Sequence, residues 1–367
     1  MKITKVTSYY SQKELVHIVK LETDAGLVGY GDCSPMDTKG NVHVIHEIFA
    51  KRLIGMDPLN IIAIEETLMK KNYKINGQIL GMAYSGIDIA LWDILGKHTG
   101  LPVCALLGGK VRDTIPFYGS SMSRDLSPRE EADKVIKAIA AYGFEGIKIK
   151  VGPRMGNGSG IIDHTQDVEK VRTVRKAVGD KTAVILDGNS SFRPSEALRL
   201  AQLLEEFDIT AFEEPCPYYD LHAYIQLAKK LPIPLSVGEQ EFNMHTMKDF
   251  ITQDSCGIYG ADLTKCGGFS NANRVSELCA MYGIIYSPHN TNRGLGLMAT
   301  NQLVLHSVSA NWYQEYSIED LAGREKYVLN RPIIKNGTFT PEMCAGIGAQ
   351  MDEARMEKDL ERAVSQV

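Results

Sequence analysis

Three acidic residues recur at equal spacing in the middle of the chain, each at the end of a short apolar run. Asp187, Glu213 and Glu239 follow one another at intervals of 26 residues, in the stretches LDGN, FEEP and VGEQ. Three converging carboxylates repel one another, so a divalent cation is their natural partner. An all-oxygen ligand set favours Mg²⁺, or Mn²⁺, over zinc. The spacing therefore predicts a magnesium site, and the alternative is three separate salt bridges.

Two lysines lie one residue apart in GFEGIKIKVG (143–152), which otherwise reads as a buried strand. Side chains alternate along a strand, so Lys148 and Lys150 point to one face and Ile149 to the other. One interpretation is an edge strand that uses lysines to block aggregation. The other is a lysine whose pKa is lowered by its surroundings, so that it acts as a base. We expect Lys150 to be that base.

A second acid/base pair is predicted from Asp262 and His289, which end two successive apolar runs. A carboxylate beside an imidazole fixes its tautomer and orientation. The position of His289, across the expected barrel from Lys150, favours catalysis. A structural hydrogen bond is the default expectation for the other histidines, which are His17, His43, His46, His98, His164, His222, His245 and His306.

Together these groups suit one kind of reaction. A substrate carboxylate held by the cation and by lysines has its α-proton acidified, because the enolate formed on proton loss is stabilised. Lys148, Lys150 and Lys265 would offset the negative charge of the site and the substrate. The sequence therefore predicts abstraction of a proton next to a carboxylate.

The elements that must position these residues alternate between apolar runs and amphipathic stretches. Parallel βαβ units are typical of this pattern, and eight units make a closed (β/α)8 barrel, whose strand ends form the catalytic face. Before residue 115 the chain has three strand-like runs and then a helical stretch, which predicts a small α+β domain. We expect a capping domain at 1–115, a barrel at 116–325 and a segment at 326–367 that packs on the cap. The eight runs are 115–122, 146–152, 183–189, 211–215, 235–240, 258–266, 284–290 and 312–316.

The composition is that of an ordinary globular protein. The 367 residues carry a net charge of −5, with 44% hydrophobic and 23% charged residues. We find no basic tract for nucleic acid and no unbroken apolar run long enough to span a bilayer. Seven cysteines without a CxxC pair favour reduced thiols. A cytoplasmic homo-oligomer that binds a small carboxylate, and neither nucleic acid nor membrane, is expected.

The motifs, in this order, resemble the mandelate racemase subgroup of the enolase superfamily over nearly the whole chain. The resemblance implies that Asp187, Glu213 and Glu239 bind Mg²⁺ and that Lys150 and His289, the latter oriented by Asp262, act on opposite faces of the α-carbon. It further implies that Lys148 binds the substrate carboxylate and that Glu315, protonated, donates to the enolate. The motifs are KIK (148–150), LDGN (186–189), FEEP (212–215), VGEQ (237–240), DLTK (262–265), SPH (287–289) and QE (314–315).

This resemblance favours dehydration of an acid sugar to a 2-keto-3-deoxy acid. The alternative is a racemase or epimerase of a 2-hydroxy or related acid. A cycloisomerase or an inactive binding barrel fits less well. Capping loops near 9–15 and 34–42 would set specificity, and the glycine-rich insert 152–163 is expected to be a lid or a surface loop. Polar residues expected to hold the substrate are Asn189, Lys265, Ser121, Arg124, Asn290 and Arg293.

Overall fold

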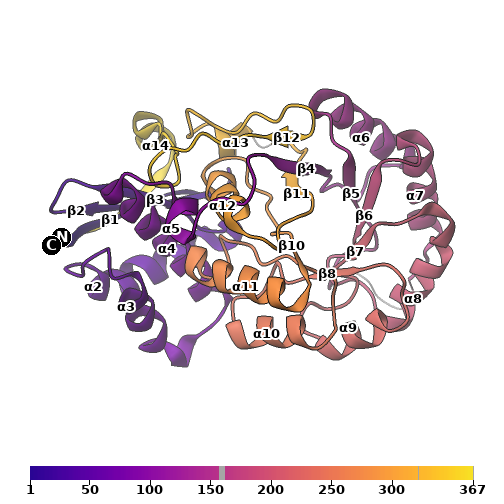
Figure 1. Cartoon of the computed structure of the whole chain (residues 1–367), viewed down its shortest axis with the longest axis horizontal. Helices are drawn as coiled ribbons and strands as arrows, with labels where there is room; N and C mark the ends of the chain where they lie inside the picture. The colour runs from indigo at the N-terminus through magenta and orange to yellow at the C-terminus, as the bar shows by residue number, and fades with distance from the viewer. Residues whose placement is uncertain (157–161, 321, 367) are drawn as a thin grey trace.

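The computed structural model describes residues 1–156, 162–320 and 322–366. It contains an antiparallel sheet on one side and a ring of parallel strands, surrounded by helices, on the other (Figure 1). The predicted barrel with an α+β cap is confirmed. The boundaries 1–115, 116–325 and 326–367 remain predictions, and residues 157–161 of the glycine-rich insert lie outside the described residues.

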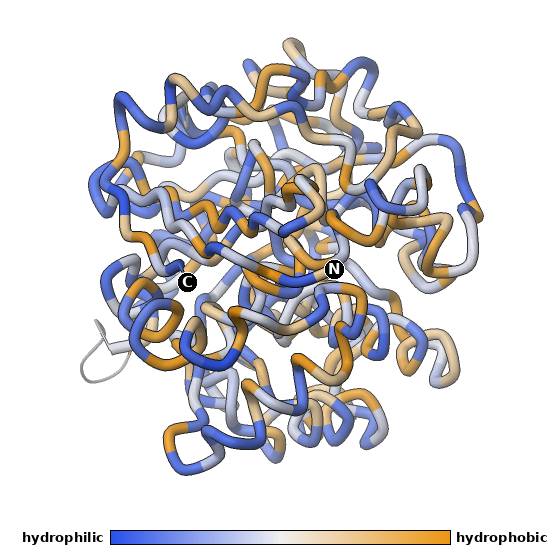
Figure 2. Tube along the Cα trace, turned by 90° about the vertical axis from the view of Figure 1, so that its left-hand side faces the viewer, coloured by the Kyte–Doolittle hydropathy of each residue, from blue (hydrophilic) through white to orange (hydrophobic). Residues whose placement is uncertain are grey.

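The capping sheet has the strand order β13-β1-β2-β3. β1 pairs antiparallel with β2 on one side and with β13 on the other, so the beginning and the end of the described chain share one sheet. Figure 2, which faces this domain, shows the two ends on the same side of the molecule. The strands are β1 (Ile3–Ser11), β2 (Val16–Thr23), β3 (Val28–Asp32) and β13 (Glu361–Gln366).

The longest helix, α4 (Gln78–Thr99), packs directly on β3 because two glycines remove the intervening side chains. A Cβ at Gly29 would lie 2.1 Å from the carbonyl oxygen of Ala90, and one at Gly31 would lie 1.9 Å from that of Gly86. The remaining helices of the cap are η1 (Pro35–Asp37), α1 (Thr38–His43), η2 (Val44–Phe49), α2 (Ala50–Leu53), α3 (Ile61–Glu65), η3 (Glu66–Lys70), η4 (Tyr73–Ile75) and α5 (Val103–Leu107).

By length and composition α4 could cross a membrane, although Asp88 and Asp93 interrupt its apolar sequence. However, 83% of its most apolar window is buried inside the protein. The helix ends at Gly100, which adopts the left-handed conformation with φ 73°. These features identify α4 as a core helix that joins the capping sheet to the barrel.

The barrel contains eight parallel strands, one for each predicted run, and each neighbouring pair from β4 to β10 is hydrogen-bonded in sequence order. β11, the last strand of the barrel, pairs with β4, the first. The Ser287 hydroxyl, just after β10, donates to the carbonyl oxygen of Tyr313, just before β11, at 3.0 Å. The strands are β4 (Ile115–Ser120), β5 (Gly146–Lys150), β6 (Ala183–Asp187), β7 (Ala211–Glu213), β8 (Leu235–Val237), β9 (Ile258–Tyr259), β10 (Ile285–Tyr286) and β11 (Gln314–Ser317).

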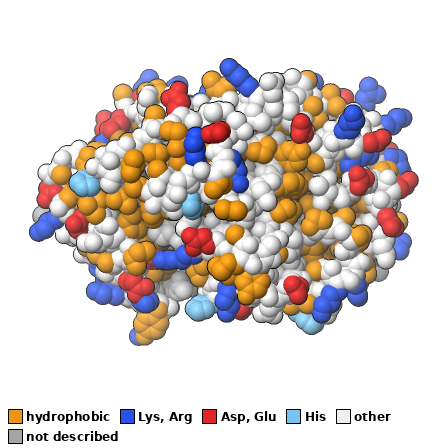
Figure 3. All heavy atoms as spheres, viewed as in Figure 1, with side chains coloured by type: hydrophobic (Ala, Val, Ile, Leu, Met, Phe, Trp, Pro, Cys, Tyr) orange, Lys and Arg blue, Asp and Glu red, His pale blue; other side chains and the backbone are white. Residues whose placement is uncertain are grey.

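The helices between the strands cover the outside of the barrel, and charged side chains gather over α6 to α8 at the right of Figure 3. Local sequence sets their bounds. At α6, Ser127 and Glu130 form a capping box, Pro128 opens the first turn and Gly143 ends the helix. These helices are α6 (Pro128–Tyr142), α7 (Thr165–Val178), α8 (Pro194–Leu203), η5 (Glu205–Phe207), α9 (Leu221–Ala228), α10 (Met244–Thr252), α11 (Gly268–Tyr282) and α12 (Leu295–His306).

After the barrel the chain returns to the cap. β12 pairs antiparallel with the first residues of β4, at the end of the barrel opposite to the carboxyl ends of the strands. The chain then passes through one more helix before β13 completes the capping sheet. These last elements are α13 (Ala322–Glu325), β12 (Thr338–Phe339) and α14 (Glu353–Asp359).

Candidate active site

The acidic residues predicted to bind metal lie at the carboxyl ends of three adjacent strands. Asp187 ends β6, Glu213 ends β7, and Glu239 lies two residues after β8. One ligand oxygen from each residue lies within 4.8 Å of those of the other two. Asn189 and Ser190, shortly after β6, and Glu214, directly after β7, have positive φ, so the backbone turns sharply at this edge.

The triad fits a hard divalent cation. All its donors are carboxylate oxygens, and Oε2 of Glu239 is buried without a hydrogen-bond partner among the described residues. Burial and the neighbouring carboxylates of Asp187 and Glu315 raise the pKa of Glu213 to about 8, although Lys148 opposes this shift. Such crowded charge calls for a cation, so these three residues could hold Mg²⁺ or Mn²⁺.

Lys148 and Lys150 point into the barrel from β5, which lies between β4 and β6. Their exposed fractions are 0% and 3%, so the edge-strand interpretation is wrong. Lys150 forms an ion pair with Asp187, and Lys148 forms one with Glu213 and a second, at 2.9 Å, with Glu315. Burial alone would raise the pKa of Asp187, but the two ammonium groups hold it at about 2.

His289 and Asp262 meet across the ends of β9 and β10. Nδ1 of His289 lies 2.7 Å from Oδ2 of Asp262, and Nε2 lies 3.4 Å from Oε2 of Glu239. The ammonium group of Lys265 is 3.9 Å from Asp262. Burial alone would lower the pKa of His289, but the carboxylates of Glu239, Glu315 and Asp262 outweigh it and raise the pKa. The imidazole is therefore oriented at Nδ1 and presents Nε2 to the site.

Glu315 lies in β11 beside Lys148. Its Oε2 accepts a hydrogen bond from the backbone N–H of Asn290 at 2.8 Å. Burial would raise the pKa of Glu315, but Lys148 and His289 hold it well below its ordinary value. The protonated form of Glu315 that the resemblance implies remains a prediction.

A cavity of about 560 Å³ lies at these strand ends. Lys150, Glu239, Lys265 and His289 line it, together with Asn189 of the predicted substrate residues. The cavity opens toward the capping domain, which contributes Leu15 and Met36 from the two loops expected to set specificity. The sequence did not single out the other lining residues, which include Met122, Arg154, Met155, Ser190, Glu214, Tyr218, Gln240, Thr291, Ser317, Glu319 and Arg324.

The other four predicted substrate residues do not line this cavity. Arg124 donates to Oδ1 of Asn189 at 2.6 Å and to the carbonyl oxygen of Val151 at 2.7 Å. Ser121 is fully buried beneath the mouth. Asn290 supports Glu315 through its backbone, and Arg293 forms an ion pair with Glu325 at 3.1 Å. Their polarity is used for contacts within the protein, and a role in substrate binding remains a prediction for each.

A carboxylate of the capping domain fixes the loop that follows His289. Asp32, at the end of β3, accepts hydrogen bonds from Nδ2 of Asn292 at 2.5 Å and from the backbone N–H of Gly296 at 2.9 Å. The N–H of Asn292 in turn donates to Oδ1 of Asn290, whose own N–H contacts Glu315. Sequence reasoning missed Asp32, because only the packing of the cap on the barrel brings it to this loop.

Comparisons with known proteins cover nearly all of the chain. Residues 3–108 match the family described as Mandelate racemase / muconate lactonizing enzyme, N-terminal domain, and residues 130–355 match Enolase C-terminal domain-like. A D-galactonate dehydratase from Ralstonia nicotianae is 31% identical over 96% of this chain and 93% of its own length. A D-galactarolactone cycloisomerase from Agrobacterium fabrum is 32% identical, covering 78% of this chain and 74% of its own. A mandelate racemase/muconate lactonizing protein from Paracoccus denitrificans, crystallised with magnesium, has a TM-score of 0.92 and 25% identity, covering 99% of this chain and 97% of its own.

Proposed function

The chain belongs to the mandelate racemase and muconate lactonizing enzyme family of the enolase superfamily, and from this premise we propose that it dehydrates an acid sugar to a 2-keto-3-deoxy acid. One observation carries the proposal: Lys150 and His289, the latter paired with Asp262, line one cavity from strands on opposite sides of the barrel, together with Glu239 of the carboxylate triad. The names of relatives such as the D-galactonate dehydratase support the substrate class.

Asp187, Glu213 and Glu239 are the residues that would hold Mg²⁺. When bound there, the cation would supply positive charge to a substrate carboxylate and so acidify the neighbouring C–H bond. The ammonium group of Lys148 lies between Glu213 and Glu315 and adds a second positive charge at the same place. Lys148 therefore binds the carboxylate end of the substrate and disperses the charge that develops on it.

The elimination step needs two proton transfers. Lys150, as the free amine, removes the proton from the α-carbon. His289, as the imidazolium, gives a proton to the β-hydroxyl, the C–O bond breaks, and water leaves together with the bonding pair. The enol that remains then tautomerises: it loses its hydroxyl proton, takes up a proton at the β-carbon and becomes the 2-keto-3-deoxy acid. Asp262 accepts from Nδ1 throughout and keeps Nε2 aimed at the substrate.

The substrate residues divide into two groups under this proposal. Asn189 and Lys265 line the cavity and bind hydroxyl or carboxylate oxygens. The other four, Ser121, Arg124, Asn290 and Arg293, act mainly by positioning the loops around the mouth. The apolar side chains of Leu15 and Met36 and the other methionines of the wall cover the C–H face of the carbon chain.

The same pair of bases also supports a second reaction. If His289 protonates the α-carbon on the face opposite to Lys150, the product is the other stereoisomer, and the enzyme is a racemase or epimerase. The two reactions share proton abstraction and differ only in what His289 protonates. Dehydration requires a leaving group on the β-carbon within reach of Nε2 of His289. Without such a group, the reaction is racemisation or epimerisation.

A library of acid sugars and 2-hydroxy acids, assayed in D₂O with Mg²⁺, tests the proposal. We expect one substrate class to give a 2-keto acid, detected with semicarbazide, and to incorporate deuterium. Optical inversion without keto-acid formation would establish the racemase instead. Full turnover in excess EDTA would rule out the metal role. We also propose that the enzyme is cytoplasmic and homo-oligomeric and that it binds neither nucleic acid nor membrane. Light scattering measures the number of subunits.

A further inference from the structure

Four lysine and arginine side chains line the active-site cavity, and two of them lack a carboxylate partner. Lys150 and Lys265 each form an ion pair with an aspartate of the site. Neither Arg154 nor Arg324 forms an ion pair with the residues that the structure describes. Arg154 is exposed, whereas Arg324 is partly buried. Arg324 is the stronger candidate to bind an anion, because a charge-assisted hydrogen bond strengthens as water is excluded.

The guanidinium of Arg324 makes a single hydrogen bond to the described part of the protein. NH1 donates to the carbonyl oxygen of Thr291, in the loop that follows β10, at 3.3 Å. Burial lowers the pKa of Arg324, and the carboxylate of Asp32, which is too far away for an ion pair, opposes this shift only in part. A guanidinium carries several N–H donors in a planar fork, so the remaining donors can serve a ligand in the cavity.

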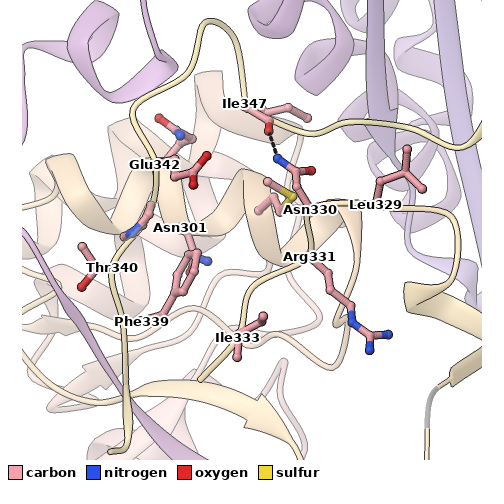
Figure 4. Close-up of a pocket in the computed structure, with 13 residues that line it drawn as sticks. Asn301, Leu329, Asn330, Arg331, Ile333, Phe339, Thr340, Glu342 and Ile347 are labelled. Carbon is pink, nitrogen blue, oxygen red and sulfur yellow. Dashed lines mark hydrogen bonds between the residues drawn. The ribbon is translucent and has the colours of Figure 1, made fainter. Parts of the chain in front are cut away.

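Two other arginines of this region already have a carboxylate. Arg293 and Arg331 both form ion pairs with Glu325, at 3.1 and 3.0 Å. Arg331 lines a separate pocket, between α12 and the chain segment 329–348 (Figure 4). The protein therefore pairs these two arginines, which do not line the active-site cavity, and leaves Arg324, which does, without a carboxylate among the described residues.

Arg324 lies across the mouth from the carboxylate triad. It follows β11 and is hydrogen-bonded to the loop after β10, whereas the triad lies at the ends of β6, β7 and β8. In the ring of strands from β4 to β11, β7 and β11 are on opposite sides. A substrate whose first carboxylate is held beside the triad and Lys148 therefore reaches Arg324 with its other end when it spans the cavity.

We propose that Arg324 binds a second anionic group, at the end of the substrate away from the carboxylate whose α-proton is removed. The substrate is then a dianion: an aldaric acid with a carboxylate at each end, or an aldonic acid phosphorylated at its last carbon. The guanidinium fits either group, because it donates two parallel hydrogen bonds to a carboxylate or a phosphate. This inference rests on the proposed function, since both anionic groups belong to the same acid sugar, and it makes Arg324 a specificity-determining residue.

Acid sugars that differ only at the last carbon test this inference. Keto-acid formation by the Mg²⁺-loaded enzyme is measured with gluconate, glucarate and 6-phosphogluconate, and with galactonate and galactarate. For the best dianion, kcat/KM should exceed that of its matched monoanion roughly tenfold or more. Arg324→Met should remove this preference, mainly by raising KM for the dianion, and Arg324→Lys should keep part of it. Arg331→Met, the matched control, should keep all of it.

Binding of unreactive acids separates this inference from the proposed reaction. Adipate, 6-phosphonohexanoate and 6-hydroxyhexanoate differ at one end and have no β-hydroxyl to lose. In calorimetry with the Mg²⁺-loaded protein, one of the two dianions should bind roughly tenfold more tightly than the hydroxy acid, and which one does so identifies the second group. Equal binding of all three acids, or a preference that survives in Arg324→Met, would overturn the role of Arg324 even where dehydration is observed. Failure to dehydrate any acid, with the binding preference intact, would overturn the proposed function and leave the anion site in place.

Discussion

Two buried histidines, one in the barrel mouth and one in the capping sheet, respond to burial in opposite ways. His289 is 8% exposed and His17, in β2, is 0% exposed. The carboxylates around His289 overcome burial and raise its pKa. Burial, together with the nearby His46, lowers the pKa of His17 to about 3. Partners, and not depth, decide whether a buried imidazole carries charge.

The contrast extends to the two regions as a whole. At the barrel mouth the buried charges compensate one another through the ion pairs of Lys148, Lys150 and His289. In the capping sheet neither ring nitrogen of His17 has a hydrogen-bond partner among the described residues. The mouth keeps its buried charges in pairs, whereas the sheet keeps a neutral ring as part of its packing. Five experiments can break or sharpen this contrast.

The largest effect is expected at the mouth, from Lys150→Ala. Removing the base should lower kcat by roughly 10³-fold or more, since a positioned base contributes up to ~10⁴-fold. Deuterium incorporation at the α-carbon of recovered substrate should fall in parallel. The melting temperature of the variant should stay within a few degrees of that of the wild type. The measurement is keto-acid formation under saturating Mg²⁺. Normal turnover would remove Lys150 from the mechanism.

His289→Asn should lower dehydration by roughly 10²–10⁴-fold. Because Lys150 remains, slow exchange of the α-proton with D₂O should persist, which separates this variant from Lys150→Ala. A variant with wild-type dehydration would show that His289 is only structural. Asp262→Asn should have a smaller effect in the same direction, since it changes the orientation of the ring and not its presence.

The pH dependence of the stability of His17→Phe tests the contrast on the side of the capping sheet. The folded pKa of His17 lies below the unfolded value of 6.5, so its contribution to stability is present above pH 6.5 and is lost as pH falls toward 3. Between pH 7 and pH 5 the wild type should therefore lose about 2 kcal/mol that the variant keeps. Urea unfolding at both pH values measures this difference. His98→Gln, at an exposed position, should behave like the wild type.

The pKa shift of His289 has the opposite sign to that of His17. Its folded pKa is raised, so its stabilising contribution is present below pH 6.5 and is lost as pH rises through the folded pKa. His289→Asn should therefore flatten the alkaline side of the stability curve, whereas His17→Phe flattens the acid side. If both variants changed the same side, the contrast between the two regions would fail.

The smallest effect is expected where the two regions meet. Asp32→Ala removes the acceptor for Asn292 and Gly296, and we expect kcat to fall about tenfold through loss of order in the loop after His289. Asp32→Asn keeps an acceptor oxygen and should retain most activity. If both variants matched the wild type, the cap would not position this loop.

The convergence of the three carboxylates was predictable from the sequence because each strand–helix unit has nearly constant length, so equal spacing places residues at equal height. Strand alternation predicted that Lys148 and Lys150 share a face, but not that this face points inward. The direction of Arg293 could not be predicted, since its partner Glu325 is brought near only by a later loop. The hydrogen bond expected for His17 was wrong, because neither of its ring nitrogens has a partner among the described residues of the packed sheet.

The pairing of β1 with β13 determines the order of events during synthesis. β1 precedes every barrel strand in the chain, whereas β13, its outer neighbour, follows all of them. A chain made at about 5–20 residues per second therefore holds an open edge on its capping sheet for tens of seconds. The capping sheet is therefore complete only after all the barrel strands have been translated.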